Sequence, residues 1–444
     1  MRIKIPALLL CLVALGFAAQ AQAQCSLTDQ ISPNPNPVGN TVVILENGAT
    51  LCNALNPFDN FGDIRGEGLP LSNYGTLNNS GVISIAAPLD NYGALNNSGG
   101  LGVNGSYLSN YGTFNNSGTA GGTSNVTVNQ VGGTLNNYGQ MGNSFYSNAG
   151  TWNNYGEVVS DAGATNSGVF NNYAGGRVRS DSNPLTNSGV LNNYFGGTVE
   201  SGGYPLNNTG MLNNAGSLYA NTINNSGQFS VLASGAANTY NYVQTAGTTR
   251  VDGTLRGFVN INGGILQGTG NIDRRFNEEQ TVSVTVNGGT IAPGNSTGTL
   301  TILGNYTQTA LGTFQAEIGG LIAGTQHNVL AVSGTATLAG TLIVLLYDLG
   351  SGIFSPHAGD TFDILTAEDI IGGFSTLSLA ALGADLAWQV SYLYDISGTT
   401  DAVRLSVMSV ANPIPEPEIY AMMLAGLGVL GFVARLKKRQ VAAA

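Results

Sequence analysis

Side chains that could carry out catalysis are few and are spread along the chain. The two histidines, His327 and His357, argue against a catalytic histidine pair and against a three-histidine zinc site. Enzymes that cleave polysaccharides use clustered carboxylates. The candidate acids here are scattered in the sequence: Glu157, Asp161, Asp181, Glu200 and Asp252. Arg177 and Arg179 lie near Asp181 in the sequence. We interpret these three residues as a solvated charged corner of the fold and not as a catalytic site. We therefore expect no catalytic, cofactor or metal site.

Composition also limits the partners of the chain. Charged residues make up 9% of it, and its three lysines, Lys4, Lys437 and Lys438, all lie close to an end. Six of the 14 basic residues lie in the two terminal segments, which leaves eight arginines against 25 acids. Such an acidic surface disfavours nucleic acid and anionic membranes as partners.

The first residues have the three-part pattern of a secretory signal peptide. Arg2 and Lys4 precede an apolar run over residues 5–19, and residues 19–23 offer two small-x-small cleavage sites. The run is too short for a membrane anchor. We expect export by the Sec machinery and removal of residues 1–23 as the signal peptide.

Export would leave two cysteines in the mature chain. Cys11 would be lost with the signal peptide, and Cys25 and Cys52 would remain in a region, residues 24–68, that we expect to form an N-terminal cap. An oxidising compartment favours one disulfide between them, with two free thiols as the alternative. The chain-entropy model gives about 3–4 kcal/mol for closing a loop of this length.

The C-terminal end combines a stiff linker, an apolar segment and a basic cluster. Pro415, Glu416 and Pro417 precede an apolar stretch over residues 421–434. A helix over residues 419–434 would span about 24 Å, slightly less than a bilayer core. The basic residues that follow would stay cytoplasmic. They are Arg435, Lys437, Lys438 and Arg439. A plain C-terminal membrane anchor is the alternative interpretation.

The order of Pro-Glu-Pro, apolar helix and basic cluster resembles the PEP-CTERM sorting signal, here over residues 411–444. The resemblance implies that an exosortase-type membrane enzyme processes the tail during export. One departure is that residues 440–444 follow the basic cluster, where such tails usually stop. We expect transient anchoring in the inner membrane and a final location at the cell surface or in the extracellular matrix.

The middle of the chain is a repeat array, in which the motif Asn-x-Gly-x-apolar-Asn-Asn recurs in complete or looser form. Successive Asn-Asn pairs begin at Asn78, Asn96, Asn115, Asn136, Asn153, Asn171, Asn192 and Asn213. The step between pairs is about 20 residues, a period typical of a solenoid with one small unit per coil. The apolar position holds Leu77, Leu95, Phe114, Leu135, Trp152, Phe170, Leu191 and Leu212.

The residue types in each repeat favour a single-stranded parallel β-helix over residues 69–305. Capped helical stretches are missing from the repeats, and Gly and Asn are poor helix formers and good turn formers. The apolar positions would stack as an interior row, and the Asn pairs would form ladders at the corners. For the repeated tyrosines we favour a core or half-buried stacked position over an outward strip that could bind sugars. They are Tyr74, Tyr92, Tyr111, Tyr138, Tyr155, Tyr173 and Tyr194.

The later strands resemble the end region of autotransporter passenger β-helices over roughly residues 240–380. Residues 289–302, 304–308, 329–334 and 359–365 carry this resemblance. We expect an all-β chain that ends in a β-rich cap over residues 306–410 and a transmembrane helix. The sequence predicts an exported structural or adhesive β-helix protein associated with exopolysaccharide. The alternative is a carbohydrate-active β-helix enzyme, which three or more carboxylates clustered in a groove would favour.

Overall fold

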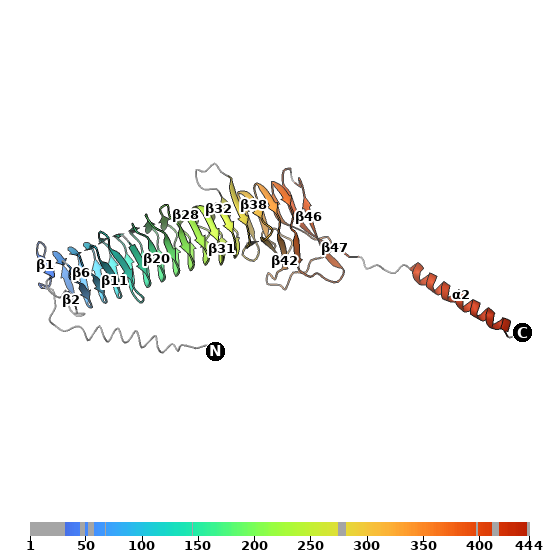
Figure 1. The fold of residues 1–444 in the computed structure, drawn as a ribbon, viewed down its shortest axis with the longest axis horizontal. Helices are drawn as coiled ribbons and strands as arrows, with labels where there is room; N and C mark the ends of the chain where they lie inside the picture. Colours follow the sequence, from blue (N-terminus) through green and yellow to red (C-terminus); the bar gives the residue numbers. More distant parts are fainter. Residues whose placement is uncertain are drawn as a thin grey trace.

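The computed structural model describes residues 32–44, 49–51, 57–66, 68–143, 145–273, 281–396, 398–410 and 417–441. Over these residues the chain forms an elongated parallel β-solenoid and one helix, α2 (Pro417–Val441) (Figure 1). The expected fold class, an all-β parallel β-helix with a C-terminal apolar helix, is confirmed. The expected signal peptide (residues 1–23), the cysteines Cys25 and Cys52, and Pro415 and Glu416 lie outside the described residues.

Each coil of the repeat region contains three short strands. In one coil, β5 (Leu71–Asn73), β6 (Thr76–Asn79) and β7 (Val82–Ile85) follow one another. The next coil begins at β8 (Leu89–Asn91), which pairs in parallel with β5. We call the three faces built by such strands the first, middle and third faces. The first corner then lies between the first and middle faces, and the second corner between the middle and third faces.

The middle face is a 16-stranded parallel sheet in the part of the chain that the structure describes. Its strands are β3 (Phe58–Asn60), β6, β9 (Ala94–Asn97), β12 (Thr113–Asn116), β15 (Thr134–Asn137), β18 (Thr151–Asn154), β21 (Val169–Asn172), β24 (Val190–Asn193), β27 (Met211–Asn214), β29 (Gln228–Val231), β31 (Thr248–Val251), β33 (Ile265–Gly268), β36 (Thr290–Pro293), β39 (Thr313–Ile318), β42 (Thr341–Leu346) and β45 (Thr376–Leu379).

The first and third faces join into one sheet, because three long strands run from the third face of one coil into the first face of the next. These are β28 (Ser217–Asn225), β30 (Ala236–Gln244) and β32 (Thr254–Ile261). Before them the first face contains β2 (Ala49–Leu51), β5, β8, β11 (Tyr107–Asn110), β14 (Val126–Asn129), β17 (Phe145–Asn148), β20 (Ala164–Asn166), β23 (Leu185–Asn187) and β26 (Leu206–Asn208). The third face contains β1 (Thr41–Ile44), β4 (Asp63–Gly66), β7, β10 (Gly100–Val103), β13 (Thr119–Gly121), β16 (Gln140–Asn143), β19 (Glu157–Ser160), β22 (Arg177–Ser180) and β25 (Thr198–Ser201).

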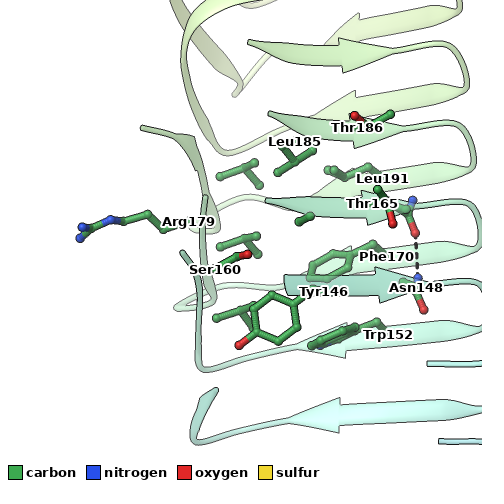
Figure 2. A pocket seen from close by; sticks show the side chains of 15 residues that line it. Tyr146, Asn148, Trp152, Ser160, Thr165, Phe170, Arg179, Leu185, Thr186 and Leu191 are labelled. Carbon is green, nitrogen blue, oxygen red and sulfur yellow. Dashed lines mark hydrogen bonds between the residues drawn. The ribbon is translucent and has the colours of Figure 1, made fainter. Parts of the chain in front are cut away.

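The register of the middle face stacks the apolar repeat positions directly above one another. Leu77 pairs with Leu95, and Trp152 pairs with Leu135 on one side and Phe170 on the other. All eight repeat positions are buried, which confirms the predicted interior row. Figure 2 shows Trp152, Phe170 and Leu191 pointing into the interior from successive strands, whereas Arg179 points away from it.

Glycine recurs in the Asn-x-Gly turns because successive coils approach closely there. A Cβ atom on Gly93 would lie 2.0 Å from the carbonyl oxygen of Gly75, and one on Gly156 would lie 2.1 Å from that of Gly139. These separations are shorter than any van der Waals contact. Alanine at either position would therefore push two coils apart.

Antiparallel strands close the C-terminal end of the solenoid. Parallel pairing continues past residue 305, through the coils that end at β44 (Asp369–Gly372) and β45. β47 (Asp401–Ser409) then pairs in antiparallel fashion with β43 (Thr361–Ala367) and with β46 (Leu386–Leu393). β47 thereby pairs with an edge of β43 that would otherwise be open to pairing with another chain.

The helix α2 differs from the rest of the chain. Tyr420–Lys438, 19 residues with a mean hydropathy of 1.4, is long and apolar enough to cross a membrane, and none of it is buried against the solenoid. By length and composition it is the one helix of this kind among the described residues.

Candidate functional site

Two buried ladders of asparagine side chains hold the corners of successive coils together. In each ladder, the Nδ2 group of one asparagine donates to the Oδ1 atom of the asparagine one coil later, over 2.6–2.8 Å. The first-corner ladder contains Asn73, Asn91, Asn110, Asn129, Asn148, Asn166, Asn187, Asn208 and Asn225. The second-corner ladder contains Asn36, Asn60, Asn79, Asn97, Asn116, Asn137, Asn154, Asn172, Asn193 and Asn214.

Each ladder asparagine also satisfies backbone carbonyl groups. The Nδ2 group of Asn91 lies 2.7 Å from Asn110 Oδ1, 3.2 Å from the carbonyl oxygen of Gly93, and 3.0 Å from that of Thr113. A buried amide is tolerated because its donor and acceptor are both used. The ladders therefore fix the turn and the spacing between coils.

A third ladder runs along the outside of the middle face. It consists of the first asparagine of each Asn-Asn pair. Its amides donate toward the N-terminal end of the solenoid, whereas the amides of the two buried ladders donate toward the C-terminal end. Asn96 donates to Asn78 over 2.8 Å, and Asn78 donates to the Asp59 carboxylate over 2.8 Å. The remaining members are Asn115, Asn136, Asn153, Asn171, Asn192 and Asn213. The predicted asparagine ladders are confirmed, with one member of each pair inside and one half-exposed outside.

The repeated tyrosines form two stacked columns on the outside of the solenoid. One stands at the first corner and contains Tyr74, Tyr92 and Tyr111; the other stands at the second corner and contains Tyr138, Tyr155, Tyr173 and Tyr194. Ring centroids lie 4.4–4.9 Å apart, and the rings are parallel within 5–8°. The favoured core or half-buried position is therefore wrong for most of them: five of the seven are exposed by 38–57%, and the columns form the outward strip that was the alternative. Each tyrosine follows a ladder asparagine whose side chain points inward, so its own side chain points outward.

Burial raises the pKa of several column tyrosines above the ordinary value of the phenol. Burial, together with the Asp90 carboxylate, raises the pKa of Tyr92 to about 12. Burial likewise raises the pKa of Tyr173. Tyr92 and Tyr173 thus present aromatic faces and uncharged phenol hydroxyl groups.

A groove of about 230 Å³ lies at the second corner, next to the Tyr138 end of the tyrosine column. Ser80, Ser98 and Ser117 occupy the position that tyrosine takes in the later coils, and the small serine side chains leave the groove open. Its floor is the outer asparagine ladder, and Phe61 and Tyr138 stand at its two ends. The main lining residues are Asp59, Phe61, Asn78, Ser80, Asn96, Ser98, Asn115, Ser117 and Tyr138.

The third face gathers three of the acids that looked scattered in the sequence. Arg177 lies 3.8 Å from Glu157 and 2.8 Å from Glu200, because β19, β22 and β25 are neighbours. Arg179 binds Asp181 beside them. These acids form ion pairs with arginine, and none of them lines the groove. The stacking of coils brings these acids together, and their spacing along the sequence did not predict that they would be neighbours.

Asp252 belongs to a different part of the solenoid. Its carboxylate accepts hydrogen bonds from the Asn295 side chain at 2.9 Å and from the Thr269 backbone at 3.2 Å, and these bonds help to lower its pKa. The bonds tie together three segments of the chain. In the part that the structure describes, no group of three or more His, Cys, Asp or Glu side chains is placed to hold a metal ion.

The C-terminal basic residues lie at the end of α2. Arg435, Lys437 and Lys438 are exposed there, and the side chains of Pro417 and Arg439 are not among those the structure describes. The fold is thus that of a β-helix protein followed by a helix that is long and apolar enough to cross a membrane. The family model for the PEP-CTERM protein-sorting motif matches residues 413–439, from just before Pro415 to Arg439. The chain carries this motif, which implies export and processing by an exosortase-type membrane enzyme. No curated protein matches the chain.

Proposed function

We propose that this chain is a structural or adhesive β-helix protein of the cell surface or extracellular matrix, associated with exopolysaccharide and without catalytic activity. It reaches that location with a Sec signal peptide at residues 1–23, and its tail anchors it in the inner membrane until an exosortase-type enzyme acts. The observation that carries the proposal is the PEP-CTERM motif on a long solenoid whose outer surface repeats uncharged amide and phenol groups.

The lack of catalytic activity is part of the proposal. The third-face acids are held in ion pairs with Arg177 and Arg179 on a sheet face. His327 is buried, and burial lowers its pKa, which suits a packed side chain better than a proton carrier. A carbohydrate-active enzyme would instead shorten the exopolysaccharide chains with which it is incubated.

The location can be tested in the producing cell. We expect the protein in the surface or matrix fraction together with exopolysaccharide, and its intact mass should lack Lys437 and Lys438. The matched control is Pro415→Ala combined with Pro417→Ala, which alters the motif and leaves the apolar helix intact; this variant should remain uncut and membrane-bound. Surface material with an uncut C-terminus would contradict the sorting role, and an absence from the matrix fraction would contradict the proposed location.

Export also predicts a disulfide between Cys25 and Cys52. We expect the mature protein to have no free thiol, so that an alkylating reagent labels it only after reduction. Mass spectrometry of the labelled peptides measures this directly. Quantitative labelling of either cysteine without a reductant would rule the bond out.

A further inference from the structure

We propose that the second-corner groove is a binding site for a neutral oligosaccharide segment of a polysaccharide. This inference rests on the proposed association with exopolysaccharide and names the site and the ligand class. The groove is bounded by Phe61 and Tyr138, floored by Asn78, Asn96 and Asn115, and kept open by the serines at the corner.

The floor of the groove offers hydrogen-bonding groups at a regular spacing. The ladder uses one N–H and one lone pair of each outer amide: Asn96, for example, donates to Asn78 and accepts from Asn115. A side-chain amide has two N–H groups and two lone pairs. Among the described residues, no further partner takes the second N–H of Asn96, which is half-exposed. Each coil, at about 4.8 Å per step, therefore presents one donor and one acceptor, a pattern that matches the hydroxyl groups of a sugar chain.

The ends of the groove offer apolar ring surfaces. Tyr138 stacks on Tyr155 at 4.9 Å with nearly parallel planes, so the opposite face of its ring is turned toward Ser117 and the groove. Tyr138 is 57% exposed, and Phe61, at the other end, is 47% exposed. They are four coil steps apart, about 19 Å. The C–H face of a pyranose ring packs on an aromatic ring in this way, and the length suits a short segment of a linear chain.

The charge of the groove selects against acidic glycans. No lysine, arginine or histidine is among the described residues that line it, and Asp59 supplies a carboxylate at one end. A uronic acid polymer would meet this carboxylate without any compensating cation. A neutral sugar carries no charge for Asp59 to repel, and elsewhere in the groove it meets amides, hydroxyl groups and rings.

The groove can be closed without disturbing the fold. Tyrosine already occupies the equivalent corner position at Tyr138, Tyr155 and Tyr173, so Ser98→Tyr should be accommodated and should fill the groove. Ser167→Tyr is the matched control. Ser167 stands in the same Asn-Ser-Gly context at the first corner, is exposed, and donates to a backbone carbonyl over 3.2 Å, as Ser98 does.

The test is calorimetric titration of the full chain with neutral tetrasaccharides, namely β-1,4-linked glucose, N-acetylglucosamine and mannose and α-1,4-linked glucose, and with tetragalacturonate. We expect at least one neutral tetrasaccharide to bind more tightly than tetragalacturonate. Ser98→Tyr and Tyr138→Ala should each weaken that binding by about tenfold or more, the scale of one lost aromatic contact. Ser167→Tyr should leave it within about twofold.

Three results would overturn the inference. They are binding to none of the neutral tetrasaccharides, preference for tetragalacturonate, and unchanged affinity in Ser98→Tyr and Tyr138→Ala. Co-fractionation of the wild-type protein with exopolysaccharide is measured separately. If co-fractionation persists in Ser98→Tyr, the proposed function stands and this groove is not the site; if the wild-type protein is absent from the matrix, the proposed function itself fails.

Discussion

Replacing Trp152 with alanine is expected to lower the free energy of unfolding by about 3–5 kcal/mol. Trp152 is fully buried, lies edge-on to Tyr146 at 5.3 Å, and is 5.4 Å from Phe170 in the next coil. The asparagine ladders hold the coils at a fixed spacing, so the neighbours cannot move in to fill the space. A cavity of about 20 Å³ already borders these rings (Figure 2). Denaturant unfolding of the full chain measures the loss.

Two variants serve as controls for this prediction. Trp152→Phe should cost less, because phenylalanine fills the same interior row at Phe114 and Phe170. Asn153→Ala, one residue away and on the outside, should cost about 1–2 kcal/mol. Because a solenoid can unfold in stages, hydrogen exchange in the strands next to β18 should accompany the unfolding curve. Equal stability of Trp152→Ala and the wild-type protein would contradict the interior row as the source of stability.

Replacing Asn154 with alanine is expected to cost about 2–4 kcal/mol, although it removes only a small polar side chain. Asn154 accepts from Asn137 over 2.8 Å and donates to Asn172 over 2.8 Å and to the Gly156 carbonyl over 2.9 Å. Its loss leaves the Asn172 acceptor buried without its ladder donor. The resulting desolvation penalty is larger than the value of an ordinary exposed hydrogen bond.

The neighbouring Asn153→Ala variant is the matched control for Asn154→Ala. Asn153 makes ladder bonds of similar length, 2.8 Å to Asn136 and 3.0 Å from Asn171, but it is half-exposed. Water can replace those bonds, so the loss should be smaller. The same unfolding experiment compares the two. Equal losses would mean that burial of the inner ladder adds nothing to its stability.

The sequence by itself determined the parts of this protein that follow local rules. The regular recurrence of the Asn-Asn pairs requires one coil per repeat, and the apolar residue before each pair has to face the interior. The two ladders of the pair follow, because adjacent residues in a strand point to opposite sides. The C-terminal tail could be identified from the sequence for a similar reason. A sorting motif depends on the order of its parts along the chain, which here are Pro415-Glu416-Pro417, the apolar stretch and the basic cluster.

The tertiary structure alone decided which residues of different coils lie side by side. Tyr111 lies at the first corner and Tyr138 at the second, so the tyrosines form two outer columns instead of one. The similar spacing of the tyrosines along the sequence does not reveal this change of corner. The groove exists because Ser80, Ser98 and Ser117 lie above one another at the second corner, between Phe61 at one end and Tyr138 at the other. Glu157 and Glu200 reach Arg177 from neighbouring coils. The physical reason is that register between coils is set by the turns and ladders of every intervening repeat. The repeats differ in length from coil to coil, so equivalent positions of different coils cannot be aligned from the sequence alone.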